Sequence, residues 1–297
     1  MREAFVNATI NLLDEDPRVA LVLADISADA FAEAARTHRD RVLNVGIREQ
    51  LMVSVAGGLA LTGLRPIVHS YAPFVVERAW EQVKLDVDHQ GVGAVVATIG
   101  ASYDASASGR THLSPGDVAL IDTLDGWTVR VPGHADEVGP LLRAAAGDDS
   151  RVYLRLSTQT NARAVATGTD GRLTVVRPAG GDEVVVAVGP TLDAVLAATE
   201  GLDVTVAYTH TPRPFDVTGL RSLATGPTPA VAIVEPYLAG TSARIIADAL
   251  RDRPHRLAAL GVGRADLHRY GTPAEHASAH GLDTAGLRRS LVEFLGR

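Results

Sequence analysis

The segment from Asn44 to Gln50 carries a carboxylate at a place where chemistry is possible. The apolar run before it, Val42 to Val45, predicts a strand that ends near Gly46, and the pattern from Ile47 to Thr62 predicts a helix. In open parallel sheets, ligands bind beyond the carboxyl ends of strands, and the helix dipole stabilises a carboxylate in the first helical turn. Glu49 is therefore a candidate catalytic carboxylate, and a glutamate that only complements the dipole is the structural alternative.

The elements that must position this carboxylate alternate along the chain. Short β-branched runs are separated by longer amphipathic stretches, which is typical of βαβ units around a parallel sheet. The strands predicted in this half are Val19 to Leu23, Val42 to Val45, Pro66 to His69, Gly93 to Ile99, Thr128 to Val131 and Val152 to Leu156. The clearest predicted helices are Ile47 to Thr62, Val75 to Val87 and Ala135 to Ala146.

The alternation is interrupted between Thr158 and Asp182, where Thr, Gly, Asn, Arg and Pro accumulate without a sustained apolar period. We predict a first domain at residues 1–162, a linker at 163–181 and a smaller second domain at 182–297. The second domain has predicted strands at Glu183 to Val188, Val204 to Tyr208, Ala230 to Val234 and Leu257 to Val262, and predicted helices at Thr191 to Thr199, Thr241 to Leu250 and Thr284 to Leu295. The expected fold class is α/β, with two domains that each contain a mostly parallel sheet flanked by helices.

Composition excludes several classes of protein. The 297 residues are 46% hydrophobic but only 4% aromatic, so aliphatic side chains must fill the core, as suits an α/β sheet. The formal net charge of -7 gives no electrostatic footprint for nucleic acid or an anionic membrane. The lack of cysteine excludes thiol nucleophiles and thiolate metal sites, and no apolar stretch reaches the ~20 residues of a membrane span. Without a signal-peptide pattern, we expect a cytoplasmic enzyme.

The residues around Glu49 resemble the GIREQ-like signature of the transketolase family, and the resemblance covers nearly the whole chain. Matching segments lie at Arg2 to Phe5, Asp16 to Val19, Ala24 to Ser27, Gly57 to Ala60, Gly63 to Pro66, Phe74 to Gln82 and Val234 to Tyr237. In addition, Gly109 to His112 and Asp117 to Leu120 are similar to the family's GPTHQ and EDIA stretches. The order and spacing of these segments imply a pyrimidine-binding domain followed by a transketolase C-terminal domain.

The resemblance implies thiamine diphosphate as cofactor. Glu49 would hydrogen-bond a ring nitrogen of the aminopyrimidine and favour its imino tautomer, which serves as the base that removes the thiazolium proton. Phe74 and Trp80 fall where the family places aromatic residues that stack on or line the pyrimidine pocket. Ordinary packing on the sheet is the alternative for both. Ile47 would be the hydrophobic wedge that keeps the cofactor bent, unless it is simply a core residue.

The resemblance also assigns a substrate side to the site. His112 matches the family's substrate-facing histidine, for substrate contact or proton transfer, and a solvated side chain is the alternative. It lies in a Gly- and Ser-rich loop from Gly100 to Gly116, which we expect to be too polar for the core.

The family's other substrate ligands are changed in this chain. Sugar-phosphate enzymes of the family hold the phosphate with an early arginine, a serine, a loop histidine and an arginine in an SRQ-like segment. Arg2 is retained, but the other positions hold Asp29, Gly100 and Thr158, and the aspartate that contacts a sugar hydroxyl is replaced by Ser108. Because Asp29 would repel a phosphate dianion, we predict transfer of a two-carbon ketol unit on a non-standard substrate.

The diphosphate-binding part of the family pattern is missing. Transketolase-family enzymes anchor the diphosphate through Mg²⁺ held by a Gly-Asp-Gly motif and a later asparagine, and no Gly-Asp-Gly occurs among these 297 residues. We therefore predict no metal ligands in this chain. The Mg²⁺ ligands would come from an N-terminal transketolase-like partner subunit, in an α2β2 heterotetramer in which this chain is the β subunit.

Three other interpretations remain open. The β subunit of a 2-oxoacid dehydrogenase and a deoxyxylulose phosphate synthase-type subunit share the two-domain architecture, although Arg48 to Gln50 and Arg78 to Gln82 favour transketolase. A non-catalytic scaffold subunit is possible because substrate ligands are lost, but Glu49 together with Phe74 argues against it. A dinucleotide binder has little support, since no G-x-G-x-x-G follows the first predicted strand.

Overall fold

Six parallel strands form the first sheet in the computed structural model, which describes residues 1–296. Their order across the sheet is β2-β1-β3-β4-β6-β5, and every neighbouring pair is parallel. The strands are β1 (Val19–Leu23), β2 (Val42–Asn44), β3 (Arg65–Tyr71), β4 (Val95–Ile99), β5 (Trp127–Arg130) and β6 (Arg151–Arg155). The carboxyl ends of β1, β2 and β3 therefore meet at one edge, where ligands of such sheets bind.

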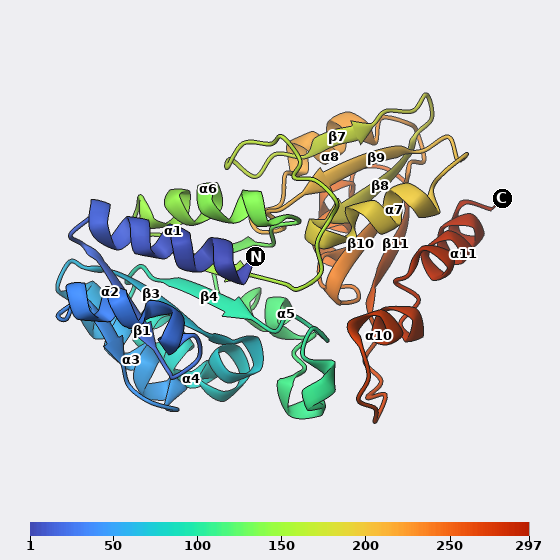
Figure 1. The fold of residues 1–297 in the computed structure, drawn as a ribbon. Helices are drawn as coiled ribbons and strands as arrows, with labels where there is room; N and C mark the ends of the chain where they lie inside the picture. The colour runs from blue at the N-terminus through green and yellow to red at the C-terminus, as the bar shows by residue number, and fades with distance from the viewer. Residues whose placement is uncertain (297) are drawn as a thin grey trace.

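Helices cover both faces of this sheet, as a parallel sheet requires (Figure 1). Successive residues of β1 point to opposite faces, so Leu21 packs under the helix pair α1 (Arg2–Glu15) and α6 (Ala135–Ala146), whereas Val22 packs under α3 (Glu49–Leu61). The remaining helical segments of the domain are α2 (Ala32–Thr37), α4 (Trp80–Gln82), α5 (Asp117–Ile121), the π-helical turns Pro73–Arg78 and Val83–His89, and the 3-10 turns Ala28–Phe31, Ser106–Ser108 and Arg110–His112.

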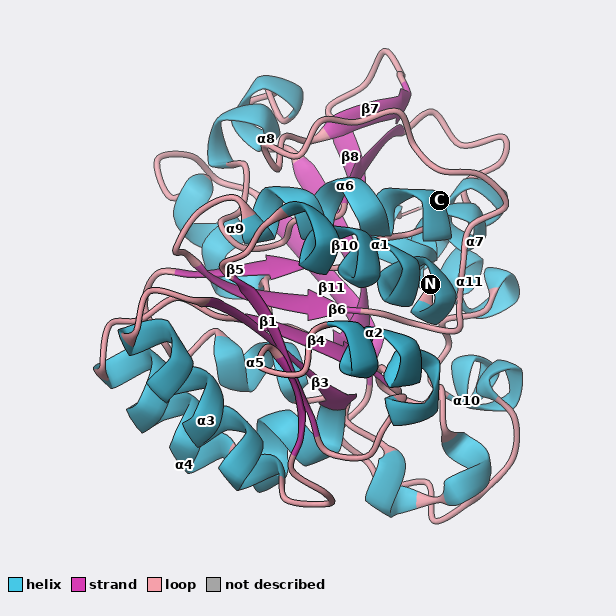
Figure 2. Ribbon diagram, turned by 60° about the vertical axis from the view of Figure 1, so that its left-hand side comes forward, coloured by secondary structure: helices cyan, strands magenta, loops and turns pink. Residues whose placement is uncertain are grey.

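The second sheet has five strands in the order β11-β10-β8-β9-β7 (Figure 2). They are β7 (Thr174–Arg177), β8 (Glu183–Val188), β9 (Thr205–Thr209), β10 (Ala230–Leu238) and β11 (Arg256–Val262). All pairs are parallel except β7 with β9. Its helices are the 3-10 turn Gly189–Thr191, α7 (Leu192–Ala198), α8 (Val217–Leu223), α9 (Ala243–Ala249), α10 (Pro273–Ala279) and α11 (Thr284–Leu295). The predicted α/β class with two mostly parallel sheets is confirmed.

One strand lies inside the segment that the sequence predicts as a linker. β7 pairs antiparallel with β9 at the edge of the second sheet, and its two valines, Val175 and Val176, are 42% and 36% exposed. Thr174, Val175 and Val176 form a β-branched run that is itself a strand signal, but it stands among polar residues and glycine and was interpreted as part of the linker.

The expectation that the Gly100–Gly116 loop is too polar for the core is wrong. Ser102, Ser106 and Ser114 are all at most 1% exposed. Their hydroxyls remain hydrogen-bonded, because Ser102 Oγ donates to the carbonyl of Pro236 at 2.5 Å and Ser106 Oγ donates to the carbonyl of Gly271 at 2.8 Å. Serine tolerates burial when its hydroxyl finds such a partner, and here the second domain supplies it.

Buried polar groups also connect the two domains. Arg155 at the end of β6 is 1% exposed, and its Nε donates to Asp117 Oδ2 at 2.7 Å while its Nη2 donates to Ser102 Oγ at 2.6 Å. The guanidinium lies 5.5 Å from the ring centre of Tyr237 in the second domain. The adjacent Asp117 carboxylate raises the pKa of Arg155 despite its burial. This network fixes the beginning of the Gly100–Gly116 loop against β10.

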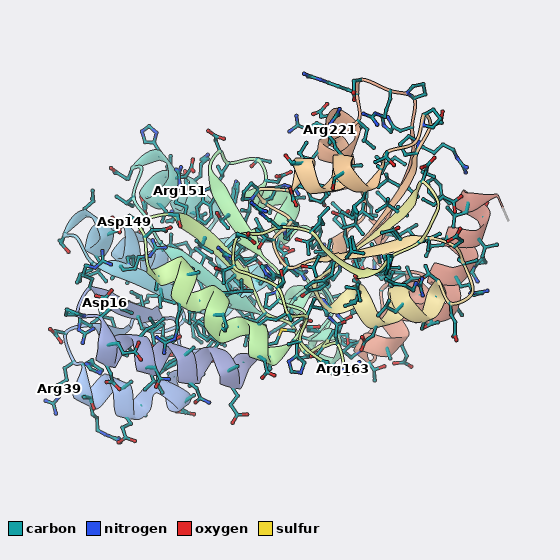
Figure 3. All side chains as sticks on the ribbon, turned by 90° about the horizontal axis from the view of Figure 1, so that it is seen from above. Asp16, Arg39, Asp149, Arg151, Arg163 and Arg221 are labelled. Carbon is teal, nitrogen blue, oxygen red and sulfur yellow. The ribbon has the colours of Figure 1, made fainter. Side chains whose placement is uncertain are left out.

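Other charged side chains lie at the periphery, as Arg39 and Arg163 do (Figure 3). Within the 296 residues described, no helix combines the length and the apolar character that crossing a membrane would require.

Candidate active site

Glu49 is the first residue of α3 and follows β2 after a tight turn. Gly46 in this turn has φ of 72°, a left-handed conformation that glycine adopts without strain. Asn44 at the end of β2 holds the turn, since its Oδ1 accepts from the backbone N–H of Gly46 at 3.1 Å and from that of Asp25 at 3.0 Å. The loops after β1 and β2 are thereby joined, and together they fix the start of the helix that carries Glu49.

The Glu49 carboxylate is buried, with 1% of the residue exposed, and it has two donors. Arg78 Nη1 donates to Oε2 at 2.8 Å, and Ser70 Oγ donates to Oε1 at 3.3 Å. The same guanidinium lies over the ring of Phe74, 4.2 Å from its centre. Because the Arg78 side chain is 40% exposed, water screens its attraction for the carboxylate. One side chain thus holds Glu49 and Phe74 together at the edge of the site.

Three aromatic rings gather beside this ion pair. Tyr71 ends β3, Phe74 lies in the π-helical turn Pro73–Arg78, and His112 ends a 3-10 turn. The ring centres are 5.0 Å apart for Phe74 and His112, 5.5 Å for Tyr71 and His112, and 5.7 Å for Tyr71 and Phe74, all edge to face. Aromatic rings attract one another in this geometry. We call the following residues the Glu49 cluster: Glu49, Ser70, Tyr71, Phe74, Arg78 and His112.

Two further predicted cofactor contacts flank the cluster in different ways. Ile47 is 71% exposed, although it is a large apolar residue one turn before the helix. Such exposure leaves it available to a ligand or a partner surface. Trp80 begins α4, is half-buried and packs against the hydrophobic core on the α3 face of the sheet. Trp80 therefore packs as an ordinary helix residue would, which was the alternative to a cofactor contact. Contact between Trp80 and a cofactor stays a prediction.

Arg2 is held by a directional chain of hydrogen bonds. His69 Nδ1 lies 3.0 Å from the carbonyl of Ala97, so Nδ1 carries the proton and Nε2 accepts from Ser27 Oγ at 2.9 Å. Ser27 Oγ in turn accepts from Arg2 Nε at 3.0 Å. Burial lowers the pKa of His69 to about 4, which keeps its ring neutral at physiological pH. The chain fixes Arg2 through Nε and leaves its two terminal nitrogens for other partners.

Ser27 reaches this chain from a strained backbone. It has φ of 65°, and Asp25 has φ of 62°, although neither is glycine. Such conformations cost about 1 kcal/mol or more each and persist where the surroundings enforce them, often at functional sites. The strained loop lies at the carboxyl end of β1, beside the predicted substrate residues.

The other predicted substrate residues lie on separate elements. Asp29 is in the 3-10 turn Ala28–Phe31, Ser108 in the turn Ser106–Ser108, and Thr158 after β6, and all three are exposed. The segment of Thr158 is anchored by Asp104, whose carboxylate accepts from the backbone N–H of Thr158 at 2.8 Å and from the hydroxyl of Ser157 at 3.0 Å. Substrate contacts of these residues stay predictions.

Four residues of the site were not predicted from the sequence: His69, Ser70, Tyr71 and Arg78. Three of them form the run His69-Ser70-Tyr71 at the carboxyl end of β3, and the rule that ligands bind beyond such ends could have identified them. Arg78 gave no comparable signal. Its pairing with Glu49 joins residues 29 positions apart and depends on the π-helical turn.

The geometry of the Glu49 cluster suits a flat nitrogen heterocycle. A carboxylate has about four lone-pair sites, and Arg78 and Ser70 use two of those on Glu49, so a ring nitrogen can still share a proton with it. The rings of Tyr71, Phe74 and His112 offer apolar faces for stacking. A buried carboxylate close to aromatic rings, at the strand ends of a two-domain α/β chain, is therefore a candidate site for a heterocyclic cofactor.

Comparison with known proteins defines the family. The transketolase pyrimidine-binding domain matches residues 1–163, which is more than half of the chain. The chain belongs to the transketolase family. This family, together with deoxyxylulose phosphate synthase, depends on thiamine diphosphate.

Relatives resemble the chain over different shares of their length. A protein of Rhodococcoides fascians, described as an uncharacterized 33.6 kDa protein in the fasciation locus, is 51% identical over 100% of this chain and 95% of its own length. The 1-deoxy-D-xylulose-5-phosphate synthase of Leptothrix cholodnii is 32% identical over 93% of this chain, which spans only 45% of that enzyme. The 6-deoxy-6-sulfo-D-fructose transketolase subunit SqwH of a Clostridium species is 28% identical over 73% of this chain and 70% of that subunit.

Solved structures share the fold of the whole chain. A split gene transketolase, described as an inactive beta4 tetramer, superposes with a TM-score of 0.81 and 24% identity over 99% of this chain and 97% of that one. The transketolase of Leishmania mexicana gives a TM-score of 0.81 at 18% identity, over 100% of this chain and 45% of that one. At these identities, the likeness concerns the fold alone.

Proposed function

We propose that this chain is the β subunit of a two-component transketolase-like enzyme, a transferase that moves a two-carbon ketol unit. The observation that carries the proposal is the burial of Glu49 in an ion pair with Arg78, whose guanidinium lies over Phe74 in the group of rings formed with Tyr71 and His112. A scaffold subunit has no need to keep a buried carboxylate next to a cluster of aromatic faces, because burying a charge costs free energy that folding must offset.

Each residue of the cluster has a proposed role toward the cofactor. Glu49 shares a proton with a ring nitrogen of the aminopyrimidine, and burial protects this hydrogen bond from competition by water. Phe74 and Tyr71 orient the ring by stacking, and exposed Ile47 supports the bent cofactor. His112, on the substrate side, donates or accepts a proton at a substrate oxygen. Thiamine diphosphate, when bound, supplies the carbon nucleophile and the electron sink of the reaction.

A partner subunit completes the proposed site. The chain has no Gly-Asp-Gly motif, so ligands for Mg²⁺ and the diphosphate come from an N-terminal transketolase-like subunit, in an α2β2 heterotetramer. Two comparisons support a divided enzyme, since one solved relative is described as a split gene transketolase and SqwH is described as a subunit. The exposed Ile47 gives this surface an apolar element for such a partner.

The proposed substrate is not a common sugar phosphate. Arg2 is the one cationic ligand that remains of the family's phosphate site, and exposed Asp29 adds a negative charge beside it. A phosphate dianion therefore meets repulsion where it would need paired arginines. Strong turnover of common pentose phosphates by the reconstituted complex would contradict this substrate proposal.

The test of the function is reconstitution with the partner and substitution of Glu49. Glu49→Ala is expected to lower kcat at least about 100-fold, since proton transfer by a positioned group contributes 10²–10⁴ in rate. Glu33→Ala is the matched control, because Glu33 is an exposed glutamate on α2 of the same domain. Equal activity of the two variants would favour a scaffold. Tight binding of thiamine diphosphate and Mg²⁺ by the isolated chain would argue against a shared site.

A second candidate is a deoxyxylulose phosphate synthase-type subunit. It is favoured by the 32% identity to the Leptothrix cholodnii enzyme, which exceeds the 28% identity to the transketolase subunit SqwH. The two candidates differ in their donor, because the synthase reaction releases carbon dioxide from a 2-oxoacid and ketol transfer does not. Release of carbon dioxide from pyruvate by the reconstituted complex would favour the synthase-type function.

A further inference from the structure

The two donors to the Glu49 carboxylate differ in their exposure. Ser70 is fully buried, whereas the side chain of Arg78 is 40% exposed. Glu49 itself is only 1% exposed, so a ligand that is to touch its carboxylate must displace a group that now surrounds it. Of the two donors, only Arg78 can turn aside into solvent without opening the core, because exposed side chains change rotamer readily.

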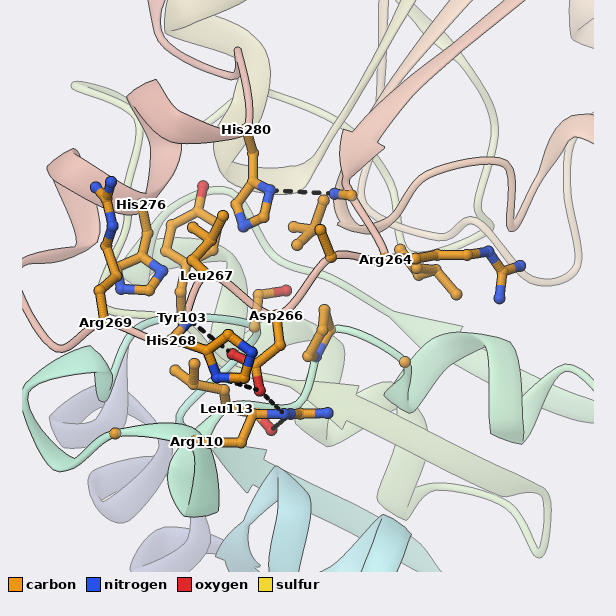
Figure 4. A pocket seen from close by; sticks show the side chains of 18 of the residues that line it. Tyr103, Arg110, Leu113, Arg264, Asp266, Leu267, His268, Arg269, His276 and His280 are labelled. Carbon is orange, nitrogen blue, oxygen red and sulfur yellow. Dashed lines mark hydrogen bonds and ion pairs between the residues drawn. The ribbon is translucent and has the colours of Figure 1, made fainter.

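The cavity of about 500 Å³ between the two domains gives no other access to this carboxylate (Figure 4). It is lined mainly by the Gly100–Gly116 loop and by residues 262–280, and no residue of the Glu49 cluster is in its wall. Glu77 lines this cavity, whereas the next residue, Arg78, is paired with Glu49. Neighbouring side chains of one turn therefore face two separate sites.

The Arg78 guanidinium makes the two contacts that a flat nitrogen heterocycle would make at this place. Its Nη1 donates to Glu49 Oε2 at 2.8 Å, as a ring N–H would. Its central carbon lies 4.2 Å from the centre of the Phe74 ring, as a stacked ring would. A guanidinium is planar, cationic and rich in N–H groups, and so is a protonated aminopyrimidine. The side chain and such a ligand therefore compete for the same carboxylate and the same aromatic face.

The main chain of Arg78 is held in place, while its side chain is not. Arg78 ends the π-helical turn Pro73–Arg78, and π-helical turns are frequent at functional sites. Gln50, the residue after Glu49, donates from Nε2 to the carbonyl of Arg78 at 3.3 Å. The start of α3 thus keeps the main chain of Arg78 beside Glu49. A change of side-chain rotamer is then sufficient to uncover the carboxylate.

We propose that Arg78 gates the Glu49 cluster, so that a flat nitrogen heterocycle reaches Glu49 and Phe74 only after the guanidinium has swung out into solvent. This inference rests on the proposed function in one respect, since it takes the ligand of Glu49 to be such a heterocycle. The gate keeps the buried carboxylate paired until the ligand replaces the guanidinium, and an unpaired buried charge would be costly. In return, the contacts that the ligand must break lower its apparent affinity.

The test measures binding of the aminopyrimidine part of the cofactor, 4-amino-5-hydroxymethyl-2-methylpyrimidine, to the full chain by ¹H–¹⁵N NMR. Arg78→Met is expected to bind this probe about tenfold more tightly than the parent, because one partly exposed ion pair and one cation–π contact no longer compete. Arg78→Lys keeps the charge without the planar fork and is expected to fall between the two. Arg36→Met is the control, since Arg36 is an exposed arginine on α2 of the same domain, and it is expected to bind as the parent does.

Two further measurements follow the guanidinium itself. Saturation of the parent with the probe is expected to move the side-chain N–H signals of Arg78 to the positions of a solvated arginine. In Arg78→Met, added methylguanidinium is expected to compete with the probe, whereas methylammonium, which is not planar, is not. Unchanged Arg78 signals, or equal effects of the two cations, would contradict the gate.

The outcomes separate the gate from the proposed function. If Arg78→Met binds the probe no more tightly than the parent, and Glu49→Ala abolishes binding, the gate is overturned and the proposed function is unaffected. Binding that persists in Glu49→Ala, or no binding by Arg78→Met, would count against both, because Glu49 would then not hold the heterocycle.

Discussion

The two domains each bury a glutamate near the carboxyl end of a parallel strand, but the two surroundings differ. Glu49 is 1% exposed, has a guanidinium at 2.8 Å and lies beside exposed groups such as Ile47 and Arg78. Glu235 lies within β10 at 0% exposure, and its Oε1 accepts from the backbone N–H of Ser242 at 3.0 Å. Burial raises the pKa of Glu235 to about 7.

This difference separates a candidate chemical site from a structural one. Glu49 is itself buried, but its partner Arg78 is 40% exposed and lies over the Phe74 ring, so only one side chain separates the carboxylate from the surface. Glu235 is fully buried, its Oε1 is bound by the backbone N–H of Ser242 just before α9, and its Oε2 has no hydrogen-bond partner among the described residues. Burial of a carboxylate alone therefore does not identify a catalytic residue. The groups that surround the carboxylate must be considered as well.

The largest expected difference between the two glutamates is in activity. Glu49→Gln in the reconstituted complex is expected to lower kcat by about 10³-fold, because an amide cannot exchange a proton with the cofactor ring. Glu235→Gln is expected to change kcat less than about twofold. Steady-state kinetics of both variants would measure this contrast, and a comparable loss in the two would contradict the distinction.

The pH dependence of stability is expected to distinguish Glu235. A carboxyl whose folded pKa is raised to about 7 favours the folded state below its unfolded pKa, and this stability is lost as the pH rises through 7. Glu235→Gln removes that loss, so the variant is expected to be about 2 kcal/mol more stable than the parent at pH 8 and equal to it near pH 4.5. Urea denaturation at both pH values measures the effect. A constant difference would show that Glu235 does not titrate in this range.

His69 in the first domain is expected to show the opposite slope. Its folded pKa is lowered to about 4, so its neutral form stabilises the fold above the unfolded pKa, and this stability is lost as the pH falls from about 6.5 toward 4. His69→Gln keeps an amide able to bond Ser27 and Ala97 but does not titrate. The stability difference between parent and variant is expected to shrink by about 2 kcal/mol from pH 7.5 to pH 4.5. Urea denaturation from pH 7.5 to pH 4.5 measures this difference. A stability difference that stays constant over this range would contradict the prediction.

Removal of Arg78 is expected to have a smaller effect that depends on Glu49. Arg78→Met leaves the buried carboxylate without its cation, and because Arg78 is 40% exposed the expected cost is only about 1 kcal/mol. In a double-mutant cycle, the cost should disappear when Glu49→Gln is also present. An equal cost in both backgrounds would mean that Arg78 acts through Phe74 rather than through Glu49.

The smallest expected effect concerns the substrate. Asp29→Ser removes one exposed negative charge near Arg2, and the KM for a phosphorylated acceptor is expected to fall about threefold, in line with the small energies of exposed charges. Asp40→Ser is a suitable control, since Asp40 is also exposed in the first domain. An unchanged KM would remove Asp29 from the proposed substrate site.

The predicted elements show how far local sequence patterns extend. All ten predicted strands occur, and most are short β-branched runs that the sheet buries, as Val19 to Leu23 is throughout β1. The helix α1 was not among the predicted helices, although Phe5, Thr9, Leu12 and Leu13 have helical spacing and are buried. Its signal was therefore present in the sequence. The same holds for β7, whose β-branched run Thr174 to Val176 was missed inside the predicted linker.

The candidate site was predictable only in part, for a physical reason. Glu49 was identified from a strand end and a helix start, which are local features, whereas Phe74 and His112 were identified from the family resemblance; the three residues do gather in one cluster. Arg78 and Ser27 act through contacts with residues distant in sequence, and the π-helical turn that brings Arg78 to Glu49 has no known local signal. Ser102 and Ser106 of the His112 loop were misjudged for the same reason, since their hydrogen-bond partners belong to the other domain.

The hydrogen bonds between the His112 loop and the second domain give that domain a second role, beyond forming its own sheet. Ser102 and Ser106 attach the loop to Pro236 and Gly271, and Arg155 secures its beginning. The second domain thus holds in place the loop that carries His112 of the first domain. Cutting the chain after residue 162 would spare every strand of the first sheet but release this loop, so a trimmed fragment would keep its framework and lose the preset position of its histidine.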